Sequence, residues 1–196
     1  MNKRDVEFLY EIGTLRNLPR SWKQVLGMDV ANDLEHMVRV MFLALIIARS
    51  EGVKDEGKIL KMVLVHDLAE TRTGDFNYVQ KVYVDPDEHR AAKDLFAGTV
   101  LDSLRQTFLS EYEERKSIEA KIVKDADNLD VDIEMKEFEE QGSLLPKKWK
   151  AFRRKVRDEK LYTKSAKKLW ELIEKSDPAS WHMTANKWVK MPKAGK

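Results

Sequence analysis

The chain has 196 residues with 36 basic and 34 acidic side chains, and its formal net charge of +2 indicates no strongly charged partner. It contains no cysteine, which excludes disulfides, thiolate metal sites and cysteine nucleophiles. The amino-terminal residues lack a continuous apolar segment, and no stretch reaches the roughly 18–20 apolar residues of a membrane span. We therefore expect a cytoplasmic protein without membrane contact.

Apolar residues recur at helical spacing along most of the chain, and the few glycines and prolines fall between these stretches. This pattern predicts an all-α fold, a compact and irregular helical bundle. The expected helices span 3–14, 32–51, 55–72, 87–108, 112–140, 146–157, 163–176 and 178–188, and the segment 73–86 is expected to be an irregular loop. Since no linker divides the chain, we expect residues 1–196 to form a single domain, in which helices within 141–196 pack on a core at about 8–140.

The predicted helices 32–51 and 55–72 differ from the others because both carry apolar residues on opposite sides. In the second of them, apolar residues surround the whole cylinder from Ile59 to Leu68. A helix that is apolar all round is buried in the middle of a bundle. We therefore expect this pair in the core, with the more polar helices packed around it.

Polar residues interrupt the predicted helix 55–72 near its end, in the sequence V-H-D-L-A-E. Burying an ionisable group without a partner costs several kcal/mol, so His66, Asp67 and Glu70 need compensation. Glu70 follows His66 by four positions and Asp67 by three, so on a helix all three border one patch. A divalent cation above this patch would compensate all three.

His36 extends the apolar stripe formed by Val40, Leu43 and Ile47, so we expect it to face inward. Two helices packed side by side could bring His36 and His66 to one point. Taken alone, His36 is better explained as a core histidine that bonds a neighbouring carbonyl group. The combination with the His-Asp pair is what favours a metal site.

The acidic helix 112–140 is expected to supply the last ligand, from the sequence K-D-A-D-N-L-D. Asp130 falls within the inward face of this helix and Asp127 lies at its edge. Periodicity slightly favours Asp130 and leaves both candidates open. We expect the neighbouring acids Asp125, Asp132 and Glu134 at the solvated surface.

In this order and spacing, these residues resemble the H…HD…D signature of the HD-domain phosphohydrolases. The sequence H-D-L-A-E-T-R-T-G-D at 66–75 is similar to the HDxxExxTGD segment of the 5′-deoxynucleotidase branch. Further similarities are L-R-N-L-P-R-S-W at 15–22 and V-K-D-A-D at 123–127. The last of these selects Asp127 over Asp130 as the expected ligand.

The resemblance implies a helical HD domain, usually a homodimer, that removes phosphate from nucleoside 5′-monophosphates, here deoxyribonucleotides. It also implies roles for individual residues. One divalent ion per chain would be held by His36, His66, Asp67 and Asp127, with Glu70 and Asp75 as catalytic residues and Arg20 and Trp22 as substrate-binding residues. Two imidazoles and two carboxylates suit Mn²⁺, Co²⁺, Fe²⁺, Ni²⁺ or Zn²⁺, and Mg²⁺ also stays open because ligand type alone does not fix the ion.

The sequence leaves three alternatives to this interpretation. An HD phosphohydrolase of triphosphates or cyclic nucleotides stays open, although the long insertions that would support the triphosphate case are absent. A metal- or nucleotide-binding regulator without catalysis stays open too, but Glu70 and Asp75 argue against it. Eleven Lys and Arg residues between 147 and 168 could bind nucleic acid, yet without a binding motif a solvated helix face is favoured.

Overall fold

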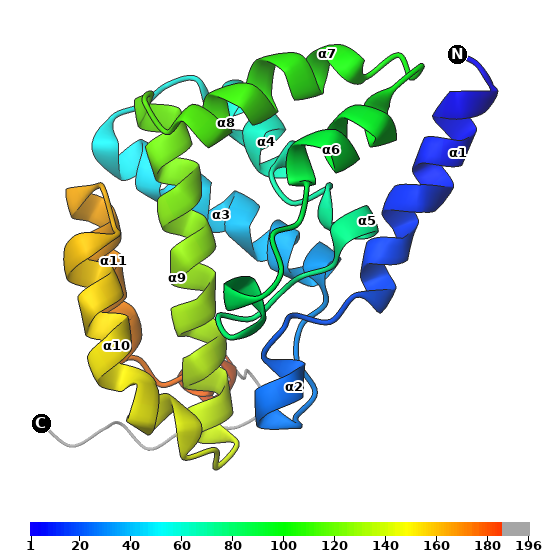
Figure 1. Cartoon of the computed structure of the whole chain (residues 1–196). Coiled ribbons are helices and arrows are strands. Elements are labelled where there is room, and N and C mark those ends of the chain that lie inside the picture. The colour runs from blue at the N-terminus through cyan, green and yellow to red at the C-terminus, as the bar shows by residue number, and fades with distance from the viewer. Residues whose placement is uncertain (186–196) are drawn as a thin grey trace, which may run out of the picture.

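Two long helices, α3 (Asp33–Glu51) and α9 (Ile118–Glu140), pack against each other in the middle of the molecule (Figure 1). The structure is a computed structural model, and it describes residues 1–185. The helix α4 (Glu56–Val65) packs on both long helices. On the other side of α9, Figure 1 shows α10 (Leu145–Glu159) and α11 (Lys164–Lys175).

Shorter helical elements surround this group. They are α1 (Lys3–Ile12), the 3₁₀ turn η1 (Gly13–Asn17), α2 (Lys23–Leu26), α5 (Glu70–Thr73), η2 (Gln80–Val82), α6 (Glu88–Phe96), α7 (Asp102–Leu104), the π-helical turn η3 (Arg105–Leu109), α8 (Ser110–Glu114) and α12 (Ser180–Ala185). Within residues 1–185 no strand forms beyond an isolated bridge between Pro19 and Asn32. The predicted all-α fold is confirmed, and the part of the expected helix 178–188 after Ala185 lies outside the described residues.

The core lies between α3, α4 and α9. Its fully buried side chains include Val40 and Ile47 of α3, Met62 of α4, and Ile122 and Leu129 of α9. Burying an aliphatic side chain of this size contributes about 1.5–3 kcal/mol to folding. Packing of these faces brings the start of α3, the end of α4 and the middle of α9 together.

The expectation that the helices at 32–51 and 55–72 are buried on all sides is wrong in part. On α3, Val38, Phe42 and Ile46 are 53%, 64% and 53% exposed, and their spacing of four places them along one face. Leu64 of α4 is also exposed. These helices border the core instead of being enclosed by it.

No helix in the described part of the chain has both the length and the apolar character to cross a bilayer.

The predicted helix 55–72 is interrupted in its last third. α4 ends at Val65, a series of turns follows, and α5 begins at Glu70. At the break, the backbone N–H groups of His66 and Leu68 bond carbonyl groups three residues back, a spacing that winds the chain more tightly than an α-helix. Glu70 is therefore positioned by a separate short helix and not by a continuation of α4.

The predicted helices 87–108 and 112–140 also break at other places than expected. The chain turns after Phe96, where Gly98 has a φ of +75°, a conformation that glycine adopts freely. It turns again at Arg115, whose φ is +58°, two residues before Ser117 caps α9. The residues between 108 and 112 are helical, so the predicted break there is wrong.

Three acids of α9 that were expected at the solvated surface, Asp125, Asp132 and Glu134, are buried. Asp132 accepts two hydrogen bonds of 2.8 and 2.7 Å from Arg153 of α10, which removes Arg153 from the solvated face predicted for 147–168. Glu134 accepts the backbone N–H of Ala31 at 2.9 Å. Helices and loops that pack on α9 cover its polar side, so each buried acid has a tertiary partner.

Asp125 fixes the start of α11, because its carboxylate accepts the backbone N–H groups of Tyr162 and Thr163 at 2.7 and 2.8 Å and the Thr163 hydroxyl at 2.7 Å. We expect Asp125→Ala to lower the free energy of unfolding by about 1–3 kcal/mol, because buried donors lose their acceptor. Urea denaturation followed by circular dichroism measures this change. The exposed Asp85→Ala is the control, with a change within about 0.5 kcal/mol; equal unfolding curves for both variants would contradict the role of Asp125.

Candidate metal centre

The four side chains predicted to hold an ion converge from three parts of the core. His36 lies near the start of α3, where the Asn32 side chain caps the helix by accepting two backbone N–H groups. His66 and Asp67 follow the end of α4, and Asp127 lies in α9. One potential ligand atom from each of the four residues lies within 4.8 Å of the others. The structure thus brings together all four predicted ligands.

The ring of His36 is oriented by Asp130. Its Nδ1 lies 2.6 Å from Asp130 Oδ2, and the side chain has no solvent exposure. An ionised carboxylate can only accept, so Nδ1 donates and Nε2 of the neutral ring carries the lone pair. Nε2 has no hydrogen-bond partner in the described part of the chain, and it lies 3.3 Å from Asp127 Oδ1 and 3.5 Å from Asp67 Oδ2.

The ring of His66 is held in a similar way by the backbone. Its Nδ1 lies 2.7 Å from the carbonyl oxygen of Val63, so Nδ1 donates and Nε2 of the neutral ring again carries the lone pair. Nε2 lies 3.1 Å from Asp67 Oδ2, and it too is buried without a hydrogen-bond partner within residues 1–185. The ring of Tyr112 packs edge-on against this imidazole with 5.5 Å between the centroids.

In its neutral form, each imidazole would direct a lone pair toward carboxylate oxygens, which is repulsive unless a proton or a cation lies between them. Burial lowers the pKa of His36, but the neighbouring carboxylates of Asp127, Asp130 and Asp67 outweigh it, so this pKa lies well above its ordinary value. The group therefore attracts positive charge. A hydrogen bond from the far nitrogen to a carboxylate or carbonyl is the usual second contact of a metal-binding histidine. The residues present fit a divalent ion with nitrogen and oxygen ligands.

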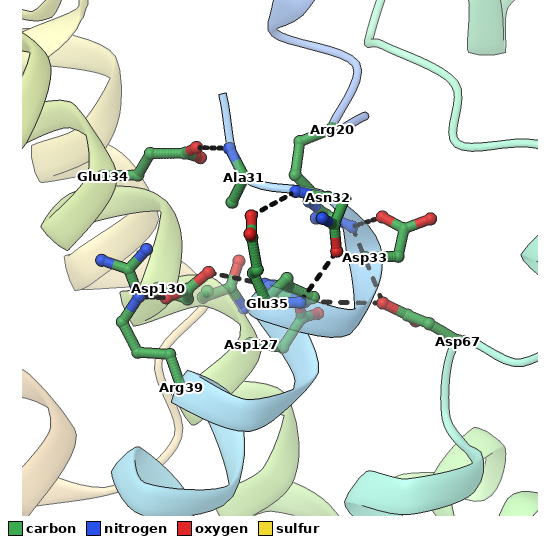
Figure 2. A network of polar contacts seen from close by, with 12 residues as sticks. Arg20, Ala31, Asn32, Asp33, Glu35, Arg39, Asp67, Asp127, Asp130 and Glu134 are labelled. Carbon is green, nitrogen blue, oxygen red and sulfur yellow. Dashed lines mark hydrogen bonds and ion pairs between the residues drawn. The ribbon is translucent and has the colours of Figure 1, made fainter. Parts of the chain in front are cut away.

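Arg20 lies among a second group of carboxylates, and Figure 2 shows it with Asp33 and Asp67. Its Nη1 is 3.3 Å from Asp33 and 3.5 Å from Asp75, with Asp67 and Glu70 at 3.8 and 3.9 Å. The side chain is buried, so these interactions are poorly screened by water. In the structure Arg20 compensates buried acids, and its binding of phosphate stays a prediction.

Glu70 has a strongly perturbed acidity. Burial, and then the charges of Asp67, Asp75 and Asp33, raise the pKa of Glu70 to about 11, although Arg20 opposes them. Its Oε2 is buried without a hydrogen-bond partner among the residues described. A carboxyl group in this state keeps its proton at neutral pH unless further positive charge enters the group. The protonation of Glu70 therefore depends on the charges of Asp67, Asp75, Asp33 and Arg20.

The predicted site residues other than His36 line one cavity of about 330 Å³. His36 lies behind this wall without solvent exposure. Asp75 accepts the backbone N–H of Ser21 at 3.0 Å, which joins the loop after α5 to the segment before α2. Trp22 is 6% exposed and forms part of the wall. Asp75 and Trp22 thus line the same cavity as His66, Asp67 and Asp127, and their roles stay predictions.

Sequence reasoning missed several residues of this cavity or its surroundings. Lys124 places Nζ 2.7 Å from Asp127 Oδ2, and its position three residues before Asp127 was an available signal. Asp33, the partner of Arg20, stands directly before the Leu34-Glu35-His36 segment. Arg115 stacks on the Tyr112 ring 3.5 Å from its centroid, and its Nη1 is buried without a hydrogen-bond partner among residues 1–185. Nothing in the sequence around Arg115 predicts this position.

Comparison with known proteins is consistent with this arrangement. A family model described as HD domain matches residues 12–176. A 5′-deoxynucleotidase HDDC2 from Danio rerio is 33% identical over 144 residues, covering 69% of this chain and 70% of the relative. The protein of the same name from Dictyostelium discoideum is 28% identical over 158 residues, covering 74% and 83%. A predicted metal-dependent phosphohydrolase from Magnetospirillum magnetotacticum has a similar fold, with a TM-score of 0.67, 23% identity, and coverage of 87% of this chain and 91% of that one.

The hydrogen bond between Asp130 and His36 yields a prediction about metal affinity. We expect Asp130→Ala to weaken Mn²⁺ binding by about 10- to 100-fold, because the ring loses the acceptor that orients it and raises its basicity. Calorimetric titration with Mn²⁺ measures this change. Glu134→Ala, which removes another buried acid one turn further along α9, is the control and should bind Mn²⁺ as the unchanged chain does. Equal affinities for the two variants would disprove the role given to Asp130.

Proposed function

This chain belongs to the HD-domain family of metal-dependent phosphohydrolases, and on that premise we propose that it removes phosphate from nucleoside 5′-monophosphates, with deoxyribonucleotides as its substrates. The name 5′-deoxynucleotidase that its relatives bear supports this substrate class. One observation carries the proposal: two buried histidine nitrogens without hydrogen-bond partners within the described chain meet two carboxylates, and Glu70 stands next to them.

We propose that His36, His66, Asp67 and Asp127 hold one divalent ion per chain. Two imidazole nitrogens and two carboxylate oxygens leave Mn²⁺, Co²⁺, Ni²⁺, Fe²⁺, Zn²⁺ and Mg²⁺ as candidates. Such an ion supplies positive charge that makes water more acidic and neutralises phosphate oxygens. Burial lets this charge act at close range with little screening.

The cationic side chains at the cavity are suited to a phosphate dianion. Arg20, Lys81, Arg115 and Lys124 all line it. Arg115 has a buried Nη1 without a hydrogen-bond partner in the described residues, so this nitrogen can donate to a phosphate oxygen. Catalysis of phosphate transfer depends mainly on positioning and on compensation of charge. The four cations support both tasks in the cavity that the predicted ion site also lines.

We propose Glu70 as the residue that exchanges a proton with the attacking water, with Asp75 as its helper. A further positive charge in the carboxylate group would lower the raised pKa of Glu70 and prepare it to accept a proton. Asp75 is fixed by the backbone N–H of Ser21 and lies with Asp33 and Glu70 in one group. From this position Asp75 can orient water or protonate the leaving oxygen.

The role of Glu70 is tested by substitution with its neutral isostere. We expect Glu70→Gln to keep its bound metal but to lower the rate of phosphate release from dAMP by about 10²- to 10⁴-fold, because the proton acceptor is lost. Phosphate release with Mn²⁺ or Co²⁺ gives the rate, and metal analysis of the purified protein gives the ion content. Glu113→Gln, an exposed acid that lines the same cavity, is the control. An unchanged rate in Glu70→Gln would remove Glu70 from the mechanism, and tight nucleotide binding without turnover in the unchanged chain would favour a regulator.

We further propose that the chain forms a homodimer through α3. Val38, Phe42 and Ile46 form an exposed apolar strip, which we call the α3 strip, along one face of this helix. Exposed apolar strips of this kind mark contact surfaces between proteins. A net charge of only +2 opposes contact between two copies weakly. The α3 strip therefore supports a second copy of this chain as its partner.

The dimer is tested by placing a charge in the α3 strip. We expect Phe42→Lys to convert the dimer to a monomer, because two ammonium groups would be buried at the shared surface. Light scattering coupled to size exclusion gives the molar mass. Leu9→Lys, at an exposed apolar position of α1, should leave the mass unchanged. A monomeric unchanged chain, or a dimeric Phe42→Lys variant, would contradict this proposal.

A further inference from the structure

A second cavity of about 360 Å³ adjoins the cavity of the predicted ion site. The two share Trp22, Tyr78 and Val131 in their linings. The second cavity continues onto α10, where Trp149, Phe152 and Arg153 complete its lining. The polar cavity of the predicted ion site therefore leads directly into a space of different chemical character.

Four aromatic rings give this second cavity its character. Trp22 lies 6.0 Å from Tyr78 and 6.0 Å from Trp149, and Tyr78 lies 5.5 Å from Phe152, all between ring centroids. We call Trp22, Tyr78, Trp149 and Phe152 the aromatic slot. Trp22 is buried in a small apolar cluster, while Tyr78 and Phe152 are 54% and 46% exposed. Large rings left in contact with water beside a polar cavity are suited to a flat apolar ligand.

The aromatic slot has few free hydrogen-bond donors or acceptors that could contact the edge of a ligand. Arg153 directs Nε and Nη2 to Asp132, and Nη2 also donates to the carbonyl oxygen of Asn128. Two polar groups remain at residues that line both cavities. They are the indole N–H of Trp22, which is buried and has no acceptor among the described residues, and the hydroxyl group of the half-exposed Tyr78. Contact inside the slot therefore rests on ring surfaces.

We propose that the aromatic slot binds the base of the nucleotide by stacking, so that purine nucleotides are favoured over pyrimidine nucleotides while adenine and guanine are treated nearly alike. This inference rests on the proposed function, which places the phosphate in the first cavity. A nucleotide has an anionic end and a flat aromatic end, and the two joined cavities have the same two characters. Stacking grows with ring area, and every base presents a π-face whatever its edge carries.

The test compares substrates with and without a base. Rates of phosphate release are measured for dAMP, dCMP and 2-deoxyribose 5-phosphate with the unchanged chain, Phe152→Ala, Phe152→Tyr and the control Tyr10→Ala. Phe152 is half exposed, and Tyr10 is an exposed aromatic residue of α1 that lines neither cavity. Binding of dAMP to the EDTA-treated proteins is measured by calorimetry as a readout that needs no turnover.

We expect Phe152→Ala to lower kcat/KM for dAMP and the affinity for dAMP by about tenfold, the size of a stacking contribution, and to change kcat/KM for 2-deoxyribose 5-phosphate by less than about twofold. Phe152→Tyr and Tyr10→Ala should behave as the unchanged chain does. An equal loss on dAMP and on 2-deoxyribose 5-phosphate would overturn the proposal, as would no loss on dAMP. If the unchanged chain hydrolyses none of the three, the proposed function fails, and the calorimetric comparison alone decides whether the slot holds a base.

Discussion

The arrangement of this site depends on two hydrogen bonds that lie on the far side of the histidine rings. Asp130 accepts from Nδ1 of His36, and the carbonyl group of Val63 accepts from Nδ1 of His66. Each bond fixes a proton on Nδ1 and leaves Nε2 facing carboxylates, where a proton or a cation can lie between them. The two Nε2 atoms and the carboxylates around them would thus be stabilised by positive charge. No described residue donates a hydrogen bond to either nitrogen.

The cationic side chains around the site are distributed unevenly among its buried carboxylates. Lys124 pairs with Asp127 on one side, and Arg20 lies among four carboxylates on the other. Glu70 is left with a pKa of about 11. Like charges that cannot all be ionised together are the physical basis of acid–base groups in active sites. The chain carries this unfavourable local charge within a core whose apolar packing between α3, α4 and α9 supplies the stability.

The fold class and the converging ligands could be predicted because periodicity reports which face of a helix is buried. Periodicity could not choose Asp127 over Asp130, since both lie toward the core, and the family resemblance made that choice. In the structure an oxygen of Asp127 lies near both histidines, while Asp130 is bonded to Nδ1 of His36. The helix break before Glu70 and the turn at Arg115 depend on local backbone bonds that periodicity does not report. Asp125 and Asp132 are buried by Thr163 and Arg153, which lie further along the chain. The local pattern of α9 contains no information about these partners.

The two polar faces of α9 link the carboxyl-terminal helices to the predicted ion site. Asp127 and Asp130 face the histidines, while Asp125 and Asp132 are bonded to Thr163 and Arg153. Rotation of α9 about its axis would break contacts on both faces together. Replacing α10 and α11 by those of a related chain would therefore shift Asp127 and Asp130 relative to the imidazoles. We expect such a chimera to keep the site only when α9 is transferred together with the residues that contact both of its faces.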